Sequence, residues 1–250
     1  MSKTINYRTS AEIDKIAAAG KQVAAFFDFI KPHVQPGIKT IELDALADQF
    51  TADHQGIAAF RDVPNYFHST CISINEQIVH GIPGERIIRD GDIVKIDFGF
   101  KKDGFIGDAC KTFIVGHVPK RVAELVAVTE EALYLSIKAV QVGNRIGDIG
   151  HVIQRFVERH RFSVVREYVG HGVGVNLHEP PNVPHFGQKG TGLMLKEGMV
   201  IAIEPMVNMG TWRSKPLADG WTVVTMDGKW SAQFEHTVAV TANGPRILTM

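Results

Sequence analysis

The sequence lacks the features that mark several common classes of protein. Its charges show no excess of either sign, with 27 basic and 27 acidic residues among 250, so nothing indicates the basic surface that nucleic-acid recognition needs. No apolar run approaches the roughly 20 residues that cross a bilayer, which argues against an integral membrane protein. No stretch rich in proline, glycine or serine divides the chain into parts.

Cysteine is also scarce. Only Cys71 and Cys110 are present, and the first residues, Met-Ser-Lys-Thr-Ile-Asn-Tyr-Arg, lack the apolar stretch of a secretory signal. We therefore expect a cytoplasmic protein. The apolar content of 44% over 250 residues is enough for one substantial core, and we expect a single domain spanning residues 1–250.

The chain does contain an internal repeat. A long helical pattern starts near Ile13, with Ser10 as its candidate N-cap, and a shorter one follows Pro36-Gly37. The same order of long helix, glycine and shorter helix returns from Val122, with Gly143 between the two helices. These patterns predict two similar halves, about 10–115 and 119–241.

The predicted strands of the two halves carry matching acids. The run DGDIVKID, which ends at Asp97, aligns with EGMVIAIE, which ends at Glu204. An Asp-Gly hairpin signal follows each run, at 103–104 and 227–228, and the strands expected after these turns carry Asp108 and Glu235. Chance similarity would explain matching helices, but matching acids within apolar runs make it the weaker explanation.

The first hairpin fixes how two of these acids face one another. A two-residue turn at 103–104 places Asp97 opposite Cys110 and Asp108 opposite Gly99, so that the two acids are diagonal neighbours about 7 to 8 Å apart on one face. No arginine or lysine is forced to lie beside them. Burying such a pair is costly unless hydrogen bonds, a charged partner or a metal compensates.

A metal site explains this pattern better than isolated acids do. A single carboxylate at a strand end more often caps a turn or is solvated, and a lone glycine-flanked histidine such as His171, in Gly-His-Gly-Val-Gly, is commonly a loop residue. Carboxylates together with imidazole suit manganese, iron, cobalt or zinc, and bridging carboxylates hold two such ions close enough for hydrolysis. We predict these ligands for two divalent ions: Asp97, Asp108, His171, Glu204 and Glu235.

At this point the sequence resembles the type I methionine aminopeptidases over nearly its whole length. The shared motifs, in order, are CISIN at 71–75 with HGIP at 80–83, the two aspartates, GHG at 170–172 with His-Glu at 178–179, EPM at 204–206 and EHT at 235–237. The resemblance implies the α+β pita-bread fold, in which two pseudo-symmetric halves form a curved antiparallel β-sheet covered by helices. It also implies removal of the initiator methionine from nascent polypeptides, with small second residues preferred.

The resemblance assigns roles to individual residues. It implies that Asp97, Asp108 and Glu235 hold one ion, and that Asp108, His171, Glu204 and Glu235 hold the other. Glu204 is then the proton carrier. His80 would contact the substrate near its amino end, and His178 would stabilise the tetrahedral oxyanion, although spacing alone would leave both as loop histidines.

The methionine pocket is the part in which this chain departs from the family. The usual Tyr-His-Gly-aromatic-Pro is replaced by Val-Pro-Asn-Tyr-Phe at 63–67, and Leu177 stands where an aromatic residue is usual. An apolar wall is still expected, although ordinary core packing is the alternative for each member. The predicted wall residues are Phe60, Tyr66, Cys71, Leu177 and Trp221.

Glu235 follows Glu204 by 31 positions, which leaves no room for the insertion of the type II enzymes, and no cysteine-rich extension precedes the domain. We therefore expect a short bacterial form that acts as a monomer, with transient ribosome association a family-level expectation only. Two alternatives stay open. One is a proline-directed aminopeptidase or dipeptidase, whose usual N-terminal domain has no room here; the other is a noncatalytic binding protein on the same fold.

Overall fold

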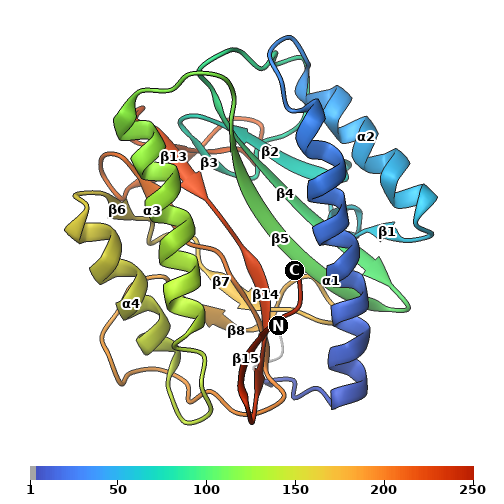
Figure 1. Ribbon diagram of the computed structural model, residues 1–250, viewed down its shortest axis with the longest axis vertical. Helices are drawn as coiled ribbons and strands as arrows, with labels where there is room; N and C mark the ends of the chain where they lie inside the picture. The colour runs from blue at the N-terminus through green and yellow to red at the C-terminus, as the bar shows by residue number, and fades with distance from the viewer. Residues whose placement is uncertain (1–3) are drawn as a thin grey trace.

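The computed structural model describes residues 4–250, and its first half contains two long helices and five strands (Figure 1). In chain order these elements are α1 (Ser10–Ile30), η1 (Lys31–His33), α2 (Thr40–Asp53), β1 (Ile57–Ala58), η2 (Ala59–Asp62), β2 (Thr70–Ile74), β3 (Gln77–Val79), β4 (Ile93–Lys102) and β5 (Phe105–Ile114).

The second half repeats the pair of helices and then continues through shorter strands. Figure 1 shows α3 and α4 beside the strands of this half, as α1 and α2 lie beside those of the first. The elements are α3 (Lys120–Ile137), α4 (Ile146–Arg159), β6 (Ser163–Val164), β7 (Gly170–Gly172), β8 (Glu179–Val183), β9 (Val200–Ile203), β10 (Met206–Asn208), β11 (Ser214–Pro216), β12 (Val223–Thr225), β13 (Ser231–Gln233), β14 (His236–Thr241) and β15 (Gly244–Ile247).

The N-cap of helix α1 lies one residue earlier in the chain than we predicted. Thr9, not Ser10, is the N-cap: its hydroxyl accepts from the N–H of Glu12, and the Glu12 side chain accepts from the N–H of Thr9. This reciprocal pair is a capping box, which satisfies two N–H groups that the first helical turn leaves free. The spacing Thr-x-x-Glu was the signal that identifies Thr9.

The β4–β5 hairpin has the predicted register. Asp103 and Gly104 both have positive φ, 50° and 81°, as a tight two-residue turn between antiparallel strands requires. Asp97 therefore lies opposite Cys110, and Gly99 lies opposite Asp108. This confirms that the two aspartates are diagonal neighbours on one face of the sheet.

The second hairpin differs from the prediction. Gly228 does close a turn, its N–H donating to the carbonyl of Thr225, but this turn joins β12 to β13 and not two paired strands. Strand β12 pairs instead with β3 of the first half. In addition, Glu235 lies between β13 and β14, where the pairing passes from β10 to β9, and not within a strand.

The two halves meet along β5 and the β13–β14 segment. The N–H of Glu235 donates to the carbonyl of Cys110 at 2.9 Å. The Thr237 hydroxyl accepts from the N–H of Asp108 at 3.1 Å and donates to its carbonyl at 2.8 Å. One predicted metal ligand of each half is thus fixed to the other half through its backbone.

Each half has its own hydrophobic core. Phe26, Phe50 and Phe98 are buried between the helices and strands of the first half, and Leu125 and Ile153 are buried in the second. A third cluster draws residues from both halves and contains four of the predicted pocket residues as buried members, with Trp221 packed against it. The site therefore lies where the two halves join.

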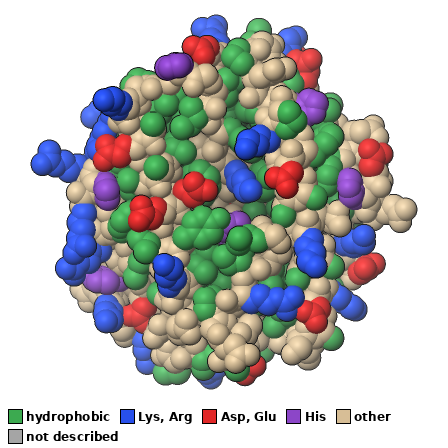
Figure 2. Space-filling model, in the orientation of Figure 1, with side chains coloured by type: hydrophobic (Ala, Val, Ile, Leu, Met, Phe, Trp, Pro, Cys, Tyr) green, Lys and Arg blue, Asp and Glu red, His purple; other side chains and the backbone are tan. Residues whose placement is uncertain are grey.

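No helix in residues 4–250 is long and apolar enough to cross a membrane. On the face drawn in Figure 2, basic and acidic side chains are interspersed among apolar ones, so this face carries no large patch of a single sign. Its appearance matches the balanced composition of the chain.

Candidate metal centre

All of the residues predicted for the site line one cavity of about 130 Å³. That volume is roughly what four or five molecules of liquid water occupy, so it admits one side chain and not a folded segment. Val63 also lines it, and it was not predicted. The predicted residues gathered there are Phe60, Tyr66, Cys71, His80, Asp97, Asp108, His171, Leu177, His178, Glu204, Trp221 and Glu235.

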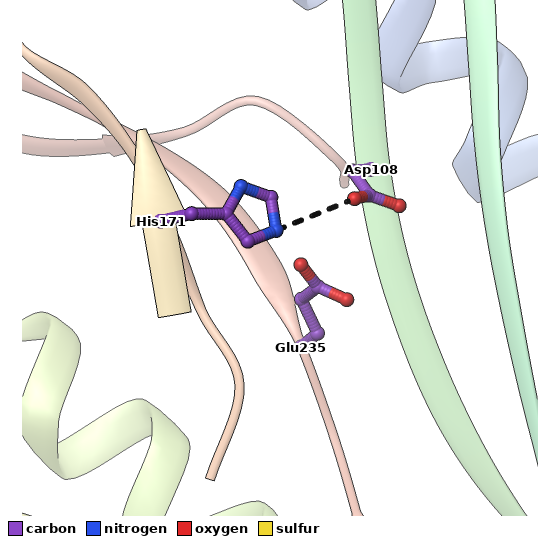
Figure 3. Close-up of side chains that lie close together, drawn as sticks. All are labelled: Asp108, His171 and Glu235. Carbon is purple, nitrogen blue, oxygen red and sulfur yellow. Dashed lines mark ion pairs between the residues drawn. The ribbon is translucent and has the colours of Figure 1, made fainter. Parts of the chain in front are cut away.

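Five different segments deliver the predicted metal ligands. Asp97 lies on β4 and Asp108 on β5, His171 is the central residue of β7, Glu204 directly follows β9, and Glu235 separates β13 from β14. Figure 3 shows the side chains of Asp108, His171 and Glu235 converging on one point from three separate elements.

His171 turns one particular ring nitrogen toward the acids. Its Nδ1 lies 2.9 Å from the carbonyl oxygen of Gly172, an acceptor, so Nδ1 carries the proton in the neutral ring. Its Nε2 then presents a lone pair 3.8 Å from Asp108 Oδ2 (Figure 3) and 3.6 Å from Glu204 Oε1. A backbone hydrogen bond that fixes the ring of a metal-binding histidine in this way is common in metalloproteins.

The carboxylates around His171 lack enough partners to be stable as they stand. Within residues 4–250, Oδ1 of Asp97, Oδ1 of Asp108 and Oε1 of Glu235 are buried and accept no hydrogen bond. Buried acceptors without partners are costly, and carboxylates that share a site also repel each other. These oxygens need donors or cations that the surrounding side chains do not provide.

The pKa values of the acids show the same imbalance. Burial, and then the charge of neighbouring acids, raises the pKa of Asp97, Glu204 and Glu235 well above the ordinary range. Burial alone raises the pKa of Asp108 to about 7. Burial also lowers the pKa of His171 to about 3, which keeps its ring neutral and able to bind a metal.

The donor set fits divalent cations. Asp108, His171 and Glu235 each offer one ligand atom, and these atoms lie within 4.8 Å of one another. Oxygen and imidazole nitrogen together suit manganese, iron, cobalt and zinc. Asp97 and Glu204, which are outside this group of three, line the same cavity, and Glu204 Oε1 lies 3.6 Å from His171 Nε2.

Three residues that the sequence did not identify support the acids. Gln233 Nε2 donates to Glu204 Oε2 at 3.1 Å, and His185 Nε2 accepts from the backbone N–H of Glu204 at 3.1 Å. Thr237 holds both backbone groups of Asp108. Gln233 lies two positions before Glu235, so the alternation of side chains along an extended strand was the signal that could have identified it.

The opposite wall of the cavity is apolar. The rings of Tyr66 and Trp221 meet edge to face with centroids 5.0 Å apart, and the Tyr66 hydroxyl donates to the carbonyl of Thr70 at 2.7 Å. Phe60, Cys71 and Leu177 are buried in the same cluster. This wall suits an apolar side chain of the substrate.

His80 and His178 stand where this cavity opens into an outer groove of about 810 Å³. The ring of His178 lies 4.4 Å from that of His171, between centroids, and its other side is exposed to the groove. Burial lowers the pKa of His178, and burial followed by the charge of His178 lowers the pKa of His80 to about 4. Both rings are therefore neutral near pH 7 and can donate a hydrogen bond.

Comparison with known proteins gives a consistent result. Residues 14–242 match metallopeptidase family M24. The chain is 48% identical over 242 residues to methionine aminopeptidase 1 of Bacillus subtilis (strain 168), covering 97% of this chain and 98% of that protein. The crystal structure of methionine aminopeptidase from Rickettsia prowazekii superimposes with a TM-score of 0.97 at 42% identity, covering 99% and 100% of the two chains.

A more distant likeness concerns the fold alone. The prolidase from Pyrococcus horikoshii OT3 matches with a TM-score of 0.76 at 22% identity, and the match covers 98% of this chain but 63% of that one. The nearly full-length matches confirm the predicted pita-bread fold and metal-dependent exopeptidase chemistry. The chain belongs to the methionine aminopeptidases of metallopeptidase family M24.

Proposed function

We propose that this chain removes the N-terminal methionine from nascent polypeptides, using two divalent ions held by the five predicted ligands. In this proposal Asp97, Asp108 and Glu235 hold one ion, and Asp108, His171, Glu204 and Glu235 hold the other. The observation that supports it most is the set of unpartnered carboxylate oxygens on one side of a cavity whose other side is apolar. Cobalt, manganese, iron and zinc all suit this donor set.

The side chains then divide the work of hydrolysis. Bound divalent ions supply Lewis-acid chemistry and a water molecule of lowered pKa. Glu204, oriented by Gln233, takes a proton from the attacking water and returns it to the departing amine; a carboxyl with a raised pKa is suited to both steps. His178 donates a hydrogen bond to the carbonyl oxygen as it gains charge, and His80 contacts the substrate near its amino end.

The shape of the site supports an exopeptidase specific for methionine. Tyr66, Trp221 and the other apolar wall residues enclose the first side chain, and the acids attract its free ammonium group. Those acids line the cavity beside the apolar wall, an arrangement that suits a substrate with a free amino terminus. His80 and His178 line both the cavity and the outer groove, so the second residue would lie beside them, and we expect small second residues to be preferred.

Several broader properties belong to the same proposal. Nascent proteins are the expected substrates, and transient association with the ribosome would bring them to the enzyme. The two cysteines are buried and unpaired, which suits the reducing cytoplasm. We further propose that residues 1–250 act as one catalytic domain and as a monomer.

A peptide assay tests the proposal. Protein reconstituted with Mn²⁺ is incubated with Met-Ala-Ser and with Ala-Pro-Ala, and the products are identified by mass spectrometry. We expect methionine release only, loss of release in Glu204→Ala, and normal release in Glu197→Ala, a matched change at an exposed acid. Cleavage of Ala-Pro-Ala would indicate a proline-directed enzyme, and no cleavage of either peptide would indicate a binding role.

A further inference from the structure

The segment before α1 lies against the second half of the chain. The backbone N–H of Arg8 donates to the carbonyl of Gly198 at 2.7 Å. Its side chain is only 10% exposed. Residues 4–6 line the outer groove together with His178 and Glu179. This segment therefore forms part of the wall around the site, although α1, which follows it, packs on β4 and β5 of the first half.

Arg8 forms a buried ion pair with Glu179. Its Nη2 donates to both carboxylate oxygens, at 2.7 Å to Oε1 and 2.5 Å to Oε2, and Asn6 Nδ2 donates to Oε2 at 2.7 Å. The backbone N–H groups of Val175 and Asn176 each donate to Oε1 at 2.9 Å. Glu179 thus connects the N-terminal segment to the loop that precedes Glu179 in the sequence.

The environment keeps this carboxylate charged. Burial acts to raise the pKa of Glu179, but hydrogen bonds from Asn176 and Asn6 and the charge of Arg8 outweigh it and lower the pKa below its ordinary value. The Glu179 side chain is 4% exposed. Removing Arg8 would leave a buried charge without its counter-ion, a change that is strongly unfavourable unless the surroundings move.

The loop held in this way, residues 173–178, connects β7 to β8 and carries two predicted site residues, Leu177 and His178. Its start is close-packed on Arg8: a Cβ on Gly174 would lie 2.7 Å from the Arg8 guanidinium. The carbonyl of Gly174 accepts from the N–H of Ile106 at 2.7 Å. Fixed points at Gly174 and Glu179 therefore bracket the residues that face the cavity.

We propose that Arg8 and Glu179 are positioning residues, which hold loop 173–178 so that His178 stands at the correct distance from the metal ligands. The N-terminal segment then helps to set the geometry of the site. This inference rests on the proposed role of His178. It assigns no chemical step to Arg8 or Glu179, which act only through the loop.

The experiment compares Arg8→Met, which removes the charge, with Arg246→Met. Arg246 makes an exposed ion pair with Asp14 that touches no part of the loop. We expect kcat for Met-Ala-Ser to fall on the order of 10- to 100-fold in Arg8→Met, because small displacements of catalytic groups cost rates of this size, and to stay unchanged in Arg246→Met. Arg8→Lys should recover part of the loss.

Two further measurements distinguish positioning from general destabilisation. In a His178→Ala background, adding Arg8→Met should lower kcat by less than about twofold, because the effects of residues that act as a unit are not additive. Hydrogen exchange should accelerate at the amides of Val175 and Asn176 in Arg8→Met, with β4 amides unchanged. The inference would be overturned if Arg8→Met lowered kcat by the same factor with and without His178, or if exchange at both amides were unchanged.

The exchange measurement does not depend on activity. If wild-type protein released no methionine, the proposed function would fail, but faster exchange in Arg8→Met would still support the tie between Arg8 and the loop. If methionine release were normal in Arg8→Met, the positioning inference alone would fail.

Discussion

Replacing Glu235 by glutamine should stabilise the metal-free protein, although it removes a predicted metal ligand. The ligand atoms of Glu235 and Asp108 lie within 4.8 Å of each other, and one oxygen of each is buried without a hydrogen-bond donor. Without cations, these carboxylates repel one another. A neutral amide at position 235 removes that repulsion and offers N–H groups to the remaining acids.

The size of the effect follows from this separation. Two unit charges 4.8 Å apart repel by about 3.5 kcal/mol at an effective dielectric constant of about 20. Proton uptake relieves part of this, so we expect a gain of about 2 kcal/mol in the free energy of unfolding at pH 8, which lies above the pKa of about 7 of Asp108. At pH 5 the gain should be smaller, because Asp108, with a pKa of about 7, is then protonated.

Urea unfolding in EDTA at pH 8 and pH 5 measures this difference, with Glu197→Gln as the control at an exposed acid. Adding Mn²⁺ should make the wild type more stable than Glu235→Gln, because a cation that binds only the folded state stabilises the wild type more than the variant that has lost a ligand. If Glu235→Gln were no more stable than the wild type at pH 8 in EDTA, the electrostatic account of the site would be refuted.

Three other changes test separate parts of the site. In EDTA, the contribution of Asp108 to stability should be fully present below pH 4 and lost as the pH rises through about 7, because folding raises its pKa from 3.8. Thermal unfolding of wild type and Asp108→Asn from pH 4.5 to 8 measures this contribution, and a stability difference between the two proteins that did not change with pH would contradict it. Thr237→Val should cost about 1 to 3 kcal/mol in urea unfolding by leaving the N–H and carbonyl of Asp108 unpaired, whereas Thr241→Val, on the same strand but partly exposed, should cost less. Trp221→Ala should raise KM for Met-Ala-Ser about tenfold, the usual effect of losing part of an apolar pocket; an unchanged KM would remove Trp221 from the methionine wall.

Features that depend on neighbouring residues could be predicted from the sequence. The register of β4 and β5 follows from the turn at Asp103-Gly104, because a two-residue turn leaves only one way to pair the strands. Asp97 and Asp108 could therefore be placed on one face. The repeat then indicated that Glu204 and Glu235 were their counterparts, and the cavity brings all four acids together.

Features that depend on distant residues could not be predicted. The turn at Asp227-Gly228 looked equivalent to the first, but β12 pairs with β3 from the other half, and no local pattern reveals that partner. Arg8 and Glu179 are 171 positions apart, and each alone resembles an ordinary surface charge. Only the folded chain shows that they are buried together beside the site.

The five predicted ligands, Asp97, Asp108, His171, Glu204 and Glu235, are proposed to hold a pair of divalent ions. Calorimetric titration of EDTA-stripped protein with Mn²⁺ tests it most directly, with Asp97→Ala as the variant, because Asp97 is assigned to one ion only. We expect two ions bound to the wild type and one to Asp97→Ala. Equal stoichiometry in the two proteins, or no binding to the wild type, would contradict it.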